Sequence, residues 1–163
     1  MHTVPFINHI ISSGNADDMI LVCEAMQEKT LAGIAERIAS SPSVKAVLLA
    51  GPSSSGKTST SRRLCIQLMA CGRHPVALSM DNWYVPRRET PLDADGNPDY
   101  ETVYAVDLNR FNADISDLVS GKEVRLPTYN FVTGEREYHG ERLRLTDDMI
   151  MVIEGIHALN PIV

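Results

Sequence analysis

Gly51-Pro52-Ser53-Ser54-Ser55-Gly56-Lys57-Thr58 stands between a short apolar segment and a stretch with helical periodicity. The spacing matches a phosphate-binding P-loop, in which a glycine and four further residues precede Gly-Lys-Ser/Thr. The two glycines let the backbone curl, so that its N–H groups and the positive end of the next helix face a phosphate. The lysine adds a charge at the transferred phosphate, and the threonine hydroxyl is placed for Mg²⁺. The residues predicted to bind the nucleotide are Gly51, Pro52, Ser53, Ser54, Ser55, Gly56, Lys57, Thr58 and Ser59.

Apolar strand patterns alternate with helical patterns on both sides of this motif. The expected strands are Val44–Ala50, Val76–Met80 and Met149–Ile153, and the expected helices are Asn15–Ala39, Lys57–Cys71 and Asp107–Ser120. A small hairpin is expected to pair Glu123–Leu126 with Arg142–Leu145, with a loop between them. The alternation predicts an α/β fold, a parallel sheet of the P-loop NTPase type with flanking helices and a hairpin insertion. We expect residues 1–40 to form an N-terminal helical segment and residues 41–163 the P-loop domain.

Composition narrows the classes of partner. The formal net charge of -6 argues against a broad surface for nucleic acid. No apolar run approaches the roughly 18 residues that a membrane span needs. The three cysteines, Cys23, Cys65 and Cys71, show no Cys-x-x-Cys spacing, so we expect buried reduced thiols and a cytoplasmic protein.

Two carboxylates follow predicted strands, where ligands of open α/β sheets bind. Asp81 comes after the second strand and could accept the proton of an attacking hydroxyl or help to hold a metal. A simple loop or helix cap would leave the same pattern. Glu154 directly follows the third strand and could take the Mg²⁺ role of a Walker-B acid, or be an exposed strand-end acid.

Aromatic and basic residues lie in the loop of the predicted hairpin. Tyr129 and Phe131 could stack a base there, and Arg136 could meet a phosphate or a ribose. Packing of the loop itself would explain the same residues. A GTPase is disfavoured, because no Asn-Lys-x-Asp occurs and Asp93-Ala94-Asp95-Gly96 lies in a turn-rich loop instead of after the third strand.

Four motifs in order give the chain a resemblance to the uridine kinase family. They are the P-loop, Asp81-Asn82-Trp83-Tyr84, Leu126-Pro127-Thr128-Tyr129-Asn130-Phe131 and Ile153-Glu154-Gly155-Ile156. The chain is most similar to a bacterial branch with the run Thr90-Pro91-Leu92-Asp93-Ala94-Asp95-Gly96-Asn97. The resemblance implies phosphorylation of the 5′-hydroxyl of a pyrimidine nucleoside, with ATP or GTP as donor and Mg²⁺ as cofactor.

The resemblance also assigns roles to residues. Asp81, together with Lys57 of the P-loop, matches the catalytic positions, and Asp81, Thr58 and Glu154 match positions around Mg²⁺. Residues around the nucleoside would be Tyr84, Tyr100, Glu101, Tyr129 and Phe131, with Arg136 nearby; Glu101 stands where the family has a ribose-binding aspartate.

Two departures from the family pattern alter these expectations. Gly134 stands where pyrimidine nucleoside kinases carry a base-contacting histidine, so we expect weak discrimination among nucleosides. The chain stops after the third core strand, where family members continue with a lid and further strands. We therefore expect a poorly active fragment that associates with itself through the open sheet edge. Remaining alternatives are a phosphoribulokinase- or pantothenate kinase-like enzyme and a non-catalytic nucleotide-binding regulatory module.

Overall fold

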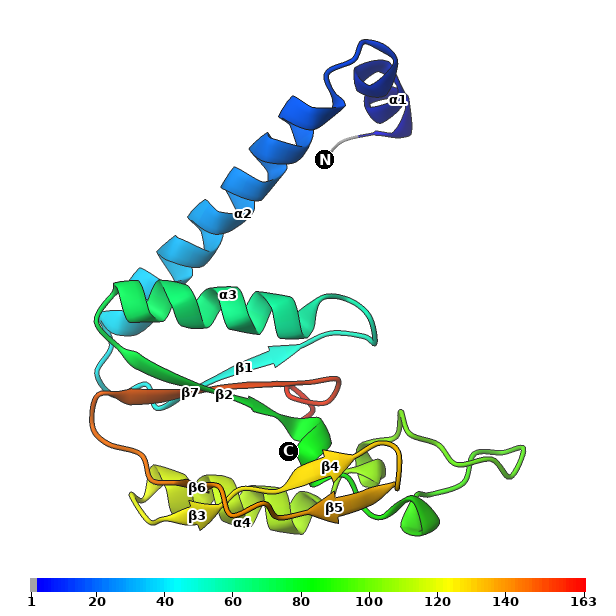
Figure 1. Cartoon of the computed structure of the whole chain (residues 1–163), viewed down its shortest axis with the longest axis vertical. Coiled ribbons are helices and arrows are strands. Elements are labelled where there is room, and N and C mark those ends of the chain that lie inside the picture. The colour runs from blue at the N-terminus through cyan, green and yellow to red at the C-terminus, as the bar shows by residue number, and fades with distance from the viewer. Residues whose placement is uncertain (1–2) are drawn as a thin grey trace.

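A computed structural model describes residues 3–163 of the chain. Its centre is a sheet of three parallel strands in the order β1-β7-β2 (Figure 1). These strands are β1 (Ala46–Ala50), β7 (Met149–Gly155) and β2 (His74–Ser79). The three strands expected from the sequence are confirmed, and the last of them lies in the middle of the sheet.

Helices cover both faces of this sheet, which confirms the predicted α/β architecture. On one face lie α2 (Ala16–Ala39) and α3 (Lys57–Ala70), and on the other lies α4 (Leu108–Val119) (Figure 1). The residues of β7 alternate between the two sides. Ile150 and Val152 pack in the core beneath α2 and α3, whereas Met151 and Ile153 pack in the core on the α4 side. A strand buried on both faces is expected for the middle of a parallel sheet.

The insertion before β7 contains two small hairpins. The predicted one pairs β3 (Val124–Arg125) with β6 (Arg142–Leu143) in antiparallel fashion. The segment between them, expected to be a loop, forms a second hairpin from β4 (Thr128–Asn130) and β5 (Glu135–Glu137). Short 3₁₀ turns at Met80–Trp83, Arg87–Glu89 and Val103–Ala105 shape the connection from β2 to α4.

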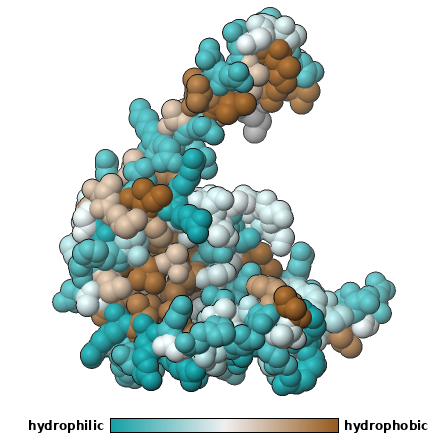
Figure 2. All heavy atoms as spheres, in the orientation of Figure 1, coloured by the Kyte–Doolittle hydropathy of each residue, from teal (hydrophilic) through white to brown (hydrophobic). Residues whose placement is uncertain are grey.

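The N-terminal part extends away from the sheet. A short helix, α1 (Val4–Ser12), precedes α2, whose first half projects outward (Figure 1). Figure 2 shows an apolar patch at this tip, where Ile10, Met19 and Val22 line a shallow depression. The second half of α2 instead contributes Leu31 and Ala35 to the core. The division of the chain at residue 40 stays a prediction.

The cysteines differ from the expectation. Cys65 is buried and Cys71 is half-buried, but Cys23 is exposed because it lies on the projecting half of α2. The expectation of three buried thiols is therefore wrong for Cys23. Within residues 3–163, no helix combines the length and apolar character needed to cross a membrane.

Candidate active site

The P-loop has a backbone path that requires glycine at two positions. Gly56, just before α3, has a φ of 84°, which residues with side chains rarely adopt. A Cβ atom at Gly51 would lie 2.8 Å from Ser55 Oγ and 3.3 Å from Lys57 Cγ. The Lys57 ammonium donates a hydrogen bond of 2.9 Å to the Pro52 carbonyl oxygen. The loop therefore has the curled form that phosphate binding requires.

The strands of the sheet end at one edge and bring distant motifs together. Ala50 of β1 pairs in register with Gly155, and Ser79 of β2 pairs with Glu154. The P-loop begins directly after Ala50, and Asp81 follows Ser79 by two positions. Because β7 lies between β1 and β2, Glu154 stands between the P-loop and Asp81. Ligands of open α/β sheets bind beyond this edge.

Two carboxylates and a hydroxyl converge next to Lys57. Thr58 Oγ1 donates a hydrogen bond of 3.2 Å to Glu154 Oε1, and Glu154 is only 8% exposed. Burial raises the pKa of Asp81, the charge of Glu154 raises it further, and the charge of Lys57 and the nearby Tyr84 hydroxyl oppose the rise. Carboxylate and hydroxyl oxygens are the ligands that Mg²⁺ prefers. The donor set of Thr58, Glu154 and Asp81 therefore fits a bound Mg²⁺.

Gly155 allows the turn that carries Asp81 to come close to β7. A Cβ atom at position 155 would lie 2.8 Å from Met80 Cβ and 2.9 Å from Met80 Cγ. Met80 is buried and directly precedes Asp81. The missing side chain of Gly155 thus leaves the space in which Met80 packs against the end of β7.

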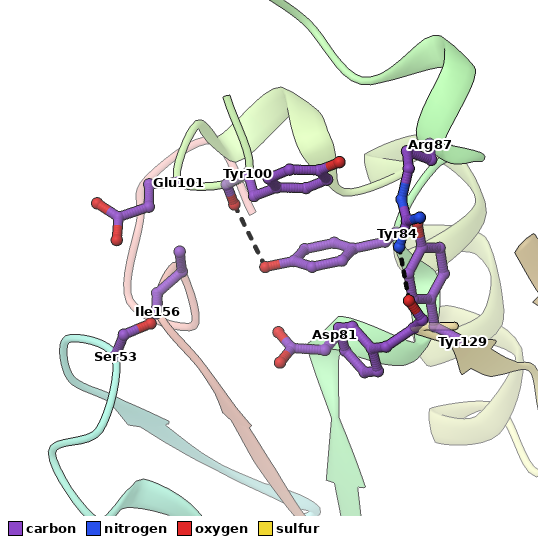
Figure 3. Close-up of a pocket in the computed structure, with 9 residues that line it drawn as sticks. Ser53, Asp81, Tyr84, Arg87, Tyr100, Glu101, Tyr129 and Ile156 are labelled. Carbon is purple, nitrogen blue, oxygen red and sulfur yellow. Dashed lines mark hydrogen bonds between the residues drawn. The ribbon is translucent and has the colours of Figure 1, made fainter. Parts of the chain in front are cut away.

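A pocket of about 390 Å³ opens beside Asp81 (Figure 3). Small-molecule sites in proteins span roughly 300–1,000 Å³ and are lined mainly by apolar and aromatic groups. The residues predicted from the sequence that line this pocket are Ser53, Asp81, Tyr84, Tyr100, Glu101, Tyr129 and Phe131. The fold therefore gathers residues from the P-loop, the segment after β2 and the second hairpin around one cavity.

Aromatic rings form one wall of the pocket. The ring centroids of Tyr84 and Tyr129 are 5.5 Å apart and those of Tyr129 and Phe131 are 5.1 Å apart, both edge to face. The Tyr129 N–H donates a hydrogen bond of 3.3 Å to Asn82 Oδ1, which ties β4 to the turn that carries Asp81. Phe131 and Tyr100 are 60% and 40% exposed, so their faces can receive a planar ring.

Glu101 lies away from the ring wall, on the side of the P-loop (Figure 3). Its backbone carbonyl oxygen lies 2.7 Å from His157 Nε2, a hydrogen-bond distance that joins this segment to the residues after β7. The Tyr84 hydroxyl donates a hydrogen bond of 3.4 Å to the Tyr100 carbonyl oxygen. Burial and the neighbouring Asp81 carboxylate raise the pKa of Tyr84 well above its usual value, so it stays a hydrogen-bond donor.

Arg136 lies outside the pocket that the other predicted residues line. Its Nη2 donates to Asp107 Oδ2 at 2.9 Å, in an ion pair whose side chains are 19% and 28% exposed. Asp107 also caps α4 by accepting a hydrogen bond from the Arg110 N–H. The ion pair therefore joins β5 to α4, and a role of Arg136 in substrate binding stays a prediction. Arg87, which no sequence motif indicated, lines the pocket instead.

A sequence model described as the Phosphoribulokinase / Uridine kinase family matches residues 46–161, well over half of the chain. The chain belongs to this family. The matched region begins with β1 and ends after β7, so it includes the P-loop, Asp81 and Glu154.

Curated relatives of the chain are named uridine kinase or uridine-cytidine kinase. The chain is 32% identical over 118 residues to uridine-cytidine kinase C of Dictyostelium discoideum, covering 72% of this chain and 24% of that protein. It is 30% identical over 111 residues to the uridine kinase of Deinococcus deserti, covering 68% and 52%. The chain thus spans about half the length, or less, of these curated relatives.

Solved structures support the family fold. One described as "Structure of a Possible Uridine Kinase from Bacillus stearothermophilus" matches with a TM-score of 0.69 at 21% identity, covering 85% of this chain and 74% of that one. A D-glycerate 3-kinase from Cryptococcus neoformans matches with a TM-score of 0.52 at 19% identity, covering 81% and 52%. Identities this low show the shared fold alone.

Proposed function

We propose that this chain acts in a kinase that transfers the γ-phosphoryl group of ATP or GTP to the 5′-hydroxyl of a uridine- or cytidine-like nucleoside. One observation carries the proposal: Asp81 stands where the P-loop edge and the aromatic pocket meet (Figure 3). A hydroxyl group in the pocket would face both the Asp81 carboxylate, which can act as a general base, and the donor phosphate. The names of the curated relatives, uridine kinase and uridine-cytidine kinase, support the same reaction.

On the donor side, the P-loop N–H groups and the start of α3 would hold the phosphates. Lys57 would move from the Pro52 carbonyl to the β- and γ-phosphates and offset their charge. Thr58 and Glu154 would hold Mg²⁺, with Asp81 close by, and the ion supplies charge neutralisation for the transferring phosphoryl group when it is bound. Removing water and fixing the phosphates in line with the acceptor then accounts for most of the catalysis.

On the acceptor side, Asp81 would take the proton of the 5′-hydroxyl as its oxygen attacks the γ-phosphorus. The bond from that phosphorus to the bridging oxygen breaks, the nucleoside diphosphate leaves, and Asp81 releases its proton to water. Burial and Glu154 raise the pKa of Asp81, which makes the carboxylate a better proton acceptor than an ordinary surface aspartate.

The pocket walls suit a nucleoside. The exposed faces of Phe131 and Tyr100 can stack a base, and Glu101 can accept hydrogen bonds from ribose hydroxyls. A phosphoribulokinase- or pantothenate kinase-like acceptor remains the alternative enzyme. A purely regulatory nucleotide-binding module is disfavoured, because Asp81 and Glu154 are both present at the sheet edge. Such a metabolite kinase would work in the cytoplasm.

The test is a substrate panel with the full-length protein, using ATP or GTP and Mg²⁺. Uridine, cytidine, adenosine, guanosine, ribulose 5-phosphate and pantothenate are offered in turn, and nucleoside diphosphate release is measured. We expect turnover with at least one pyrimidine nucleoside above the background without acceptor. Turnover only with a sugar phosphate or pantothenate would reassign the acceptor, and no acceptor-dependent turnover would refute the enzyme.

A further inference from the structure

Gly134 lies in the turn between β4 and β5, and the space beside it is filled. A Cβ atom at this position would lie 2.7 Å from Arg87 Cβ, 2.8 Å from its Nε and 3.1 Å from its Cζ. The glycine also has a φ of 73°, which a side chain would strain. The Arg87 side chain therefore runs directly across Gly134, and it brings a polar group to a position where the glycine itself has none; weak discrimination among nucleosides stays a prediction.

Arg87 is anchored to this turn at both its backbone and its guanidinium group. The Arg87 N–H donates a hydrogen bond of 2.8 Å to the Gly134 carbonyl oxygen. Its Nη2 donates a second hydrogen bond of 2.6 Å to the Phe131 carbonyl oxygen. A guanidinium has five N–H donors, so this contact leaves others available to a ligand.

The guanidinium group of Arg87 has no ion-pair partner within residues 3–163. Neighbouring arginines are paired: Arg88 with Glu135, and Arg136 with Asp107. Arg87 and Tyr129 line the same pocket, and the positive charge of Arg87 opposes the rise in the pKa of Tyr129 that burial causes.

Figure 3 shows the two ends of the pocket. Ser53 and Glu101 lie at one end, Arg87 lies at the other, and Asp81 and the rings of Tyr84 and Tyr100 are between them. An acceptor whose sugar hydroxyls face Asp81 and Glu101 would therefore direct its opposite end to Arg87.

Resting on the proposed function, we infer that Arg87 determines specificity by recognising the substituent at C4 of a pyrimidine nucleoside, favouring a 4-oxo over a 4-amino base. In such a nucleoside, C4 lies across the ring from the sugar, so this substituent points away from the 5′-hydroxyl. The guanidinium only donates hydrogen bonds, and the 4-oxo group of uridine only accepts them. The 4-amino group of cytidine donates and would leave both groups without a partner.

The experiment measures kcat/KM of the full-length protein for uridine and for cytidine at saturating ATP. We expect the wild type to favour uridine by at least about tenfold, the contribution of one hydrogen bond to a charged group. Arg87→Gln presents an amide that can donate or accept, so the ratio should move close to one. Gly134→Ala displaces the arginine and should lower the ratio in the same direction.

Arg88→Gln is the matched control, because Arg88 adjoins Arg87 in sequence but pairs with Glu135 outside the pocket lining. Its uridine-to-cytidine ratio should equal that of the wild type. A wild-type ratio near one, or an Arg87→Gln ratio equal to the wild-type ratio, overturns the inference and leaves the proposed function standing. Failure of the wild type to phosphorylate any nucleoside overturns the proposed function, and the inference with it.

Discussion

Thr58 Oγ1 donates a hydrogen bond of 3.2 Å to Glu154 Oε1, across 96 positions of the chain. Thr58 lies in the first turn of α3, and Glu154 is near the end of the middle strand, β7. The contact ties the helix after the P-loop to the sheet edge from which Asp81 also emerges. Its two oxygen-bearing groups are those expected around Mg²⁺ in phosphoryl transfer.

Lys57→Ala should abolish binding of Mg-nucleotide measured by calorimetry. The ammonium donates its hydrogen bond to the exposed Pro52 carbonyl, so its removal should leave the circular dichroism spectrum intact. Lys45→Ala is the control. Lys45 directly precedes β1, at the end of the strand away from the P-loop, and forms an ion pair with Asp147. Unchanged nucleotide affinity in Lys57→Ala would exclude the predicted role of this lysine.

Asp81→Asn should lower kcat by about 10²–10⁴-fold, the usual contribution of a general base. The base must be deprotonated and its pKa is raised, so the wild-type kcat/KM should increase with pH through a value above the ordinary carboxyl range. The variant should show a lower kcat/KM that does not increase with pH over this range. Activity of the variant within a few-fold of wild type, with the same increase of kcat/KM with pH, would rule out Asp81 as the base.

The same raised pKa predicts that Asp81→Asn stabilises the protein at neutral pH. The folded state binds the proton more tightly than the unfolded state, so stability is lost as pH rises from the unfolded pKa through the folded pKa. The advantage of the variant in the free energy of unfolding should shrink as pH falls, when both states are protonated. Denaturant titrations at several pH values measure this difference, with Asp17→Asn at the exposed start of α2 as the control. A variant less stable than wild type at pH 7 would contradict the prediction.

Arg136→Ala should reduce stability and leave the KM for the nucleoside nearly unchanged. Its ion pair with Asp107 joins β5 to α4 and is partly buried, so the free energy of unfolding should fall by roughly 1–3 kcal/mol. Arg142→Ala breaks an exposed pair with Glu123 and should cost less than about 1 kcal/mol. A raised KM with unchanged stability would instead support the substrate-binding role predicted from the sequence.

Self-association should depend on the β1 edge. In the part of the chain that the structure describes, β1 pairs only with β7, and Leu48 on β1 is 43% exposed beside an apolar groove. Unpaired strand edges invite pairing with another chain. Sedimentation of this chain should show mass that rises with concentration, and Leu48→Lys should reduce it. Ile66→Lys, an exposed position on α3, should not. A monomer at all concentrations would show that the β1 edge does not pair with another chain.

Regular patterns made the central elements predictable. The three strands, the helices from α2 onward and the outer hairpin each carried a clear period or a turn signal, and the P-loop motif predicted both the turn after β1 and the start of α3. The second hairpin, with strands of three residues each, was expected to be a loop. A usable signal was Asn130, whose side chain accepts hydrogen bonds from the Val132 and Thr133 N–H groups in the turn.

The site was predictable where motifs stand at strand ends, and less so where packing decides. Asp81 and Glu154 follow strands, so parallel pairing alone brings them together. The sequence could not show which arginine lines the pocket. Arg136 is held outside it by its ion pair with Asp107, whereas the missing side chain of Gly134 leaves room for Arg87. Both outcomes depend on contacts between segments far apart in the chain.

Following the γ-phosphoryl group itself tests the proposed kinase most directly. Full-length protein is incubated with γ-labelled ATP, Mg²⁺ and uridine, and the products are separated. The label should appear in uridine 5′-monophosphate with the wild type, and should be nearly absent with Asp81→Asn or with 5′-deoxyuridine as acceptor. Label recovered only as inorganic phosphate, or transferred equally well by Asp81→Asn, would contradict phosphoryl transfer to the nucleoside with Asp81 as base.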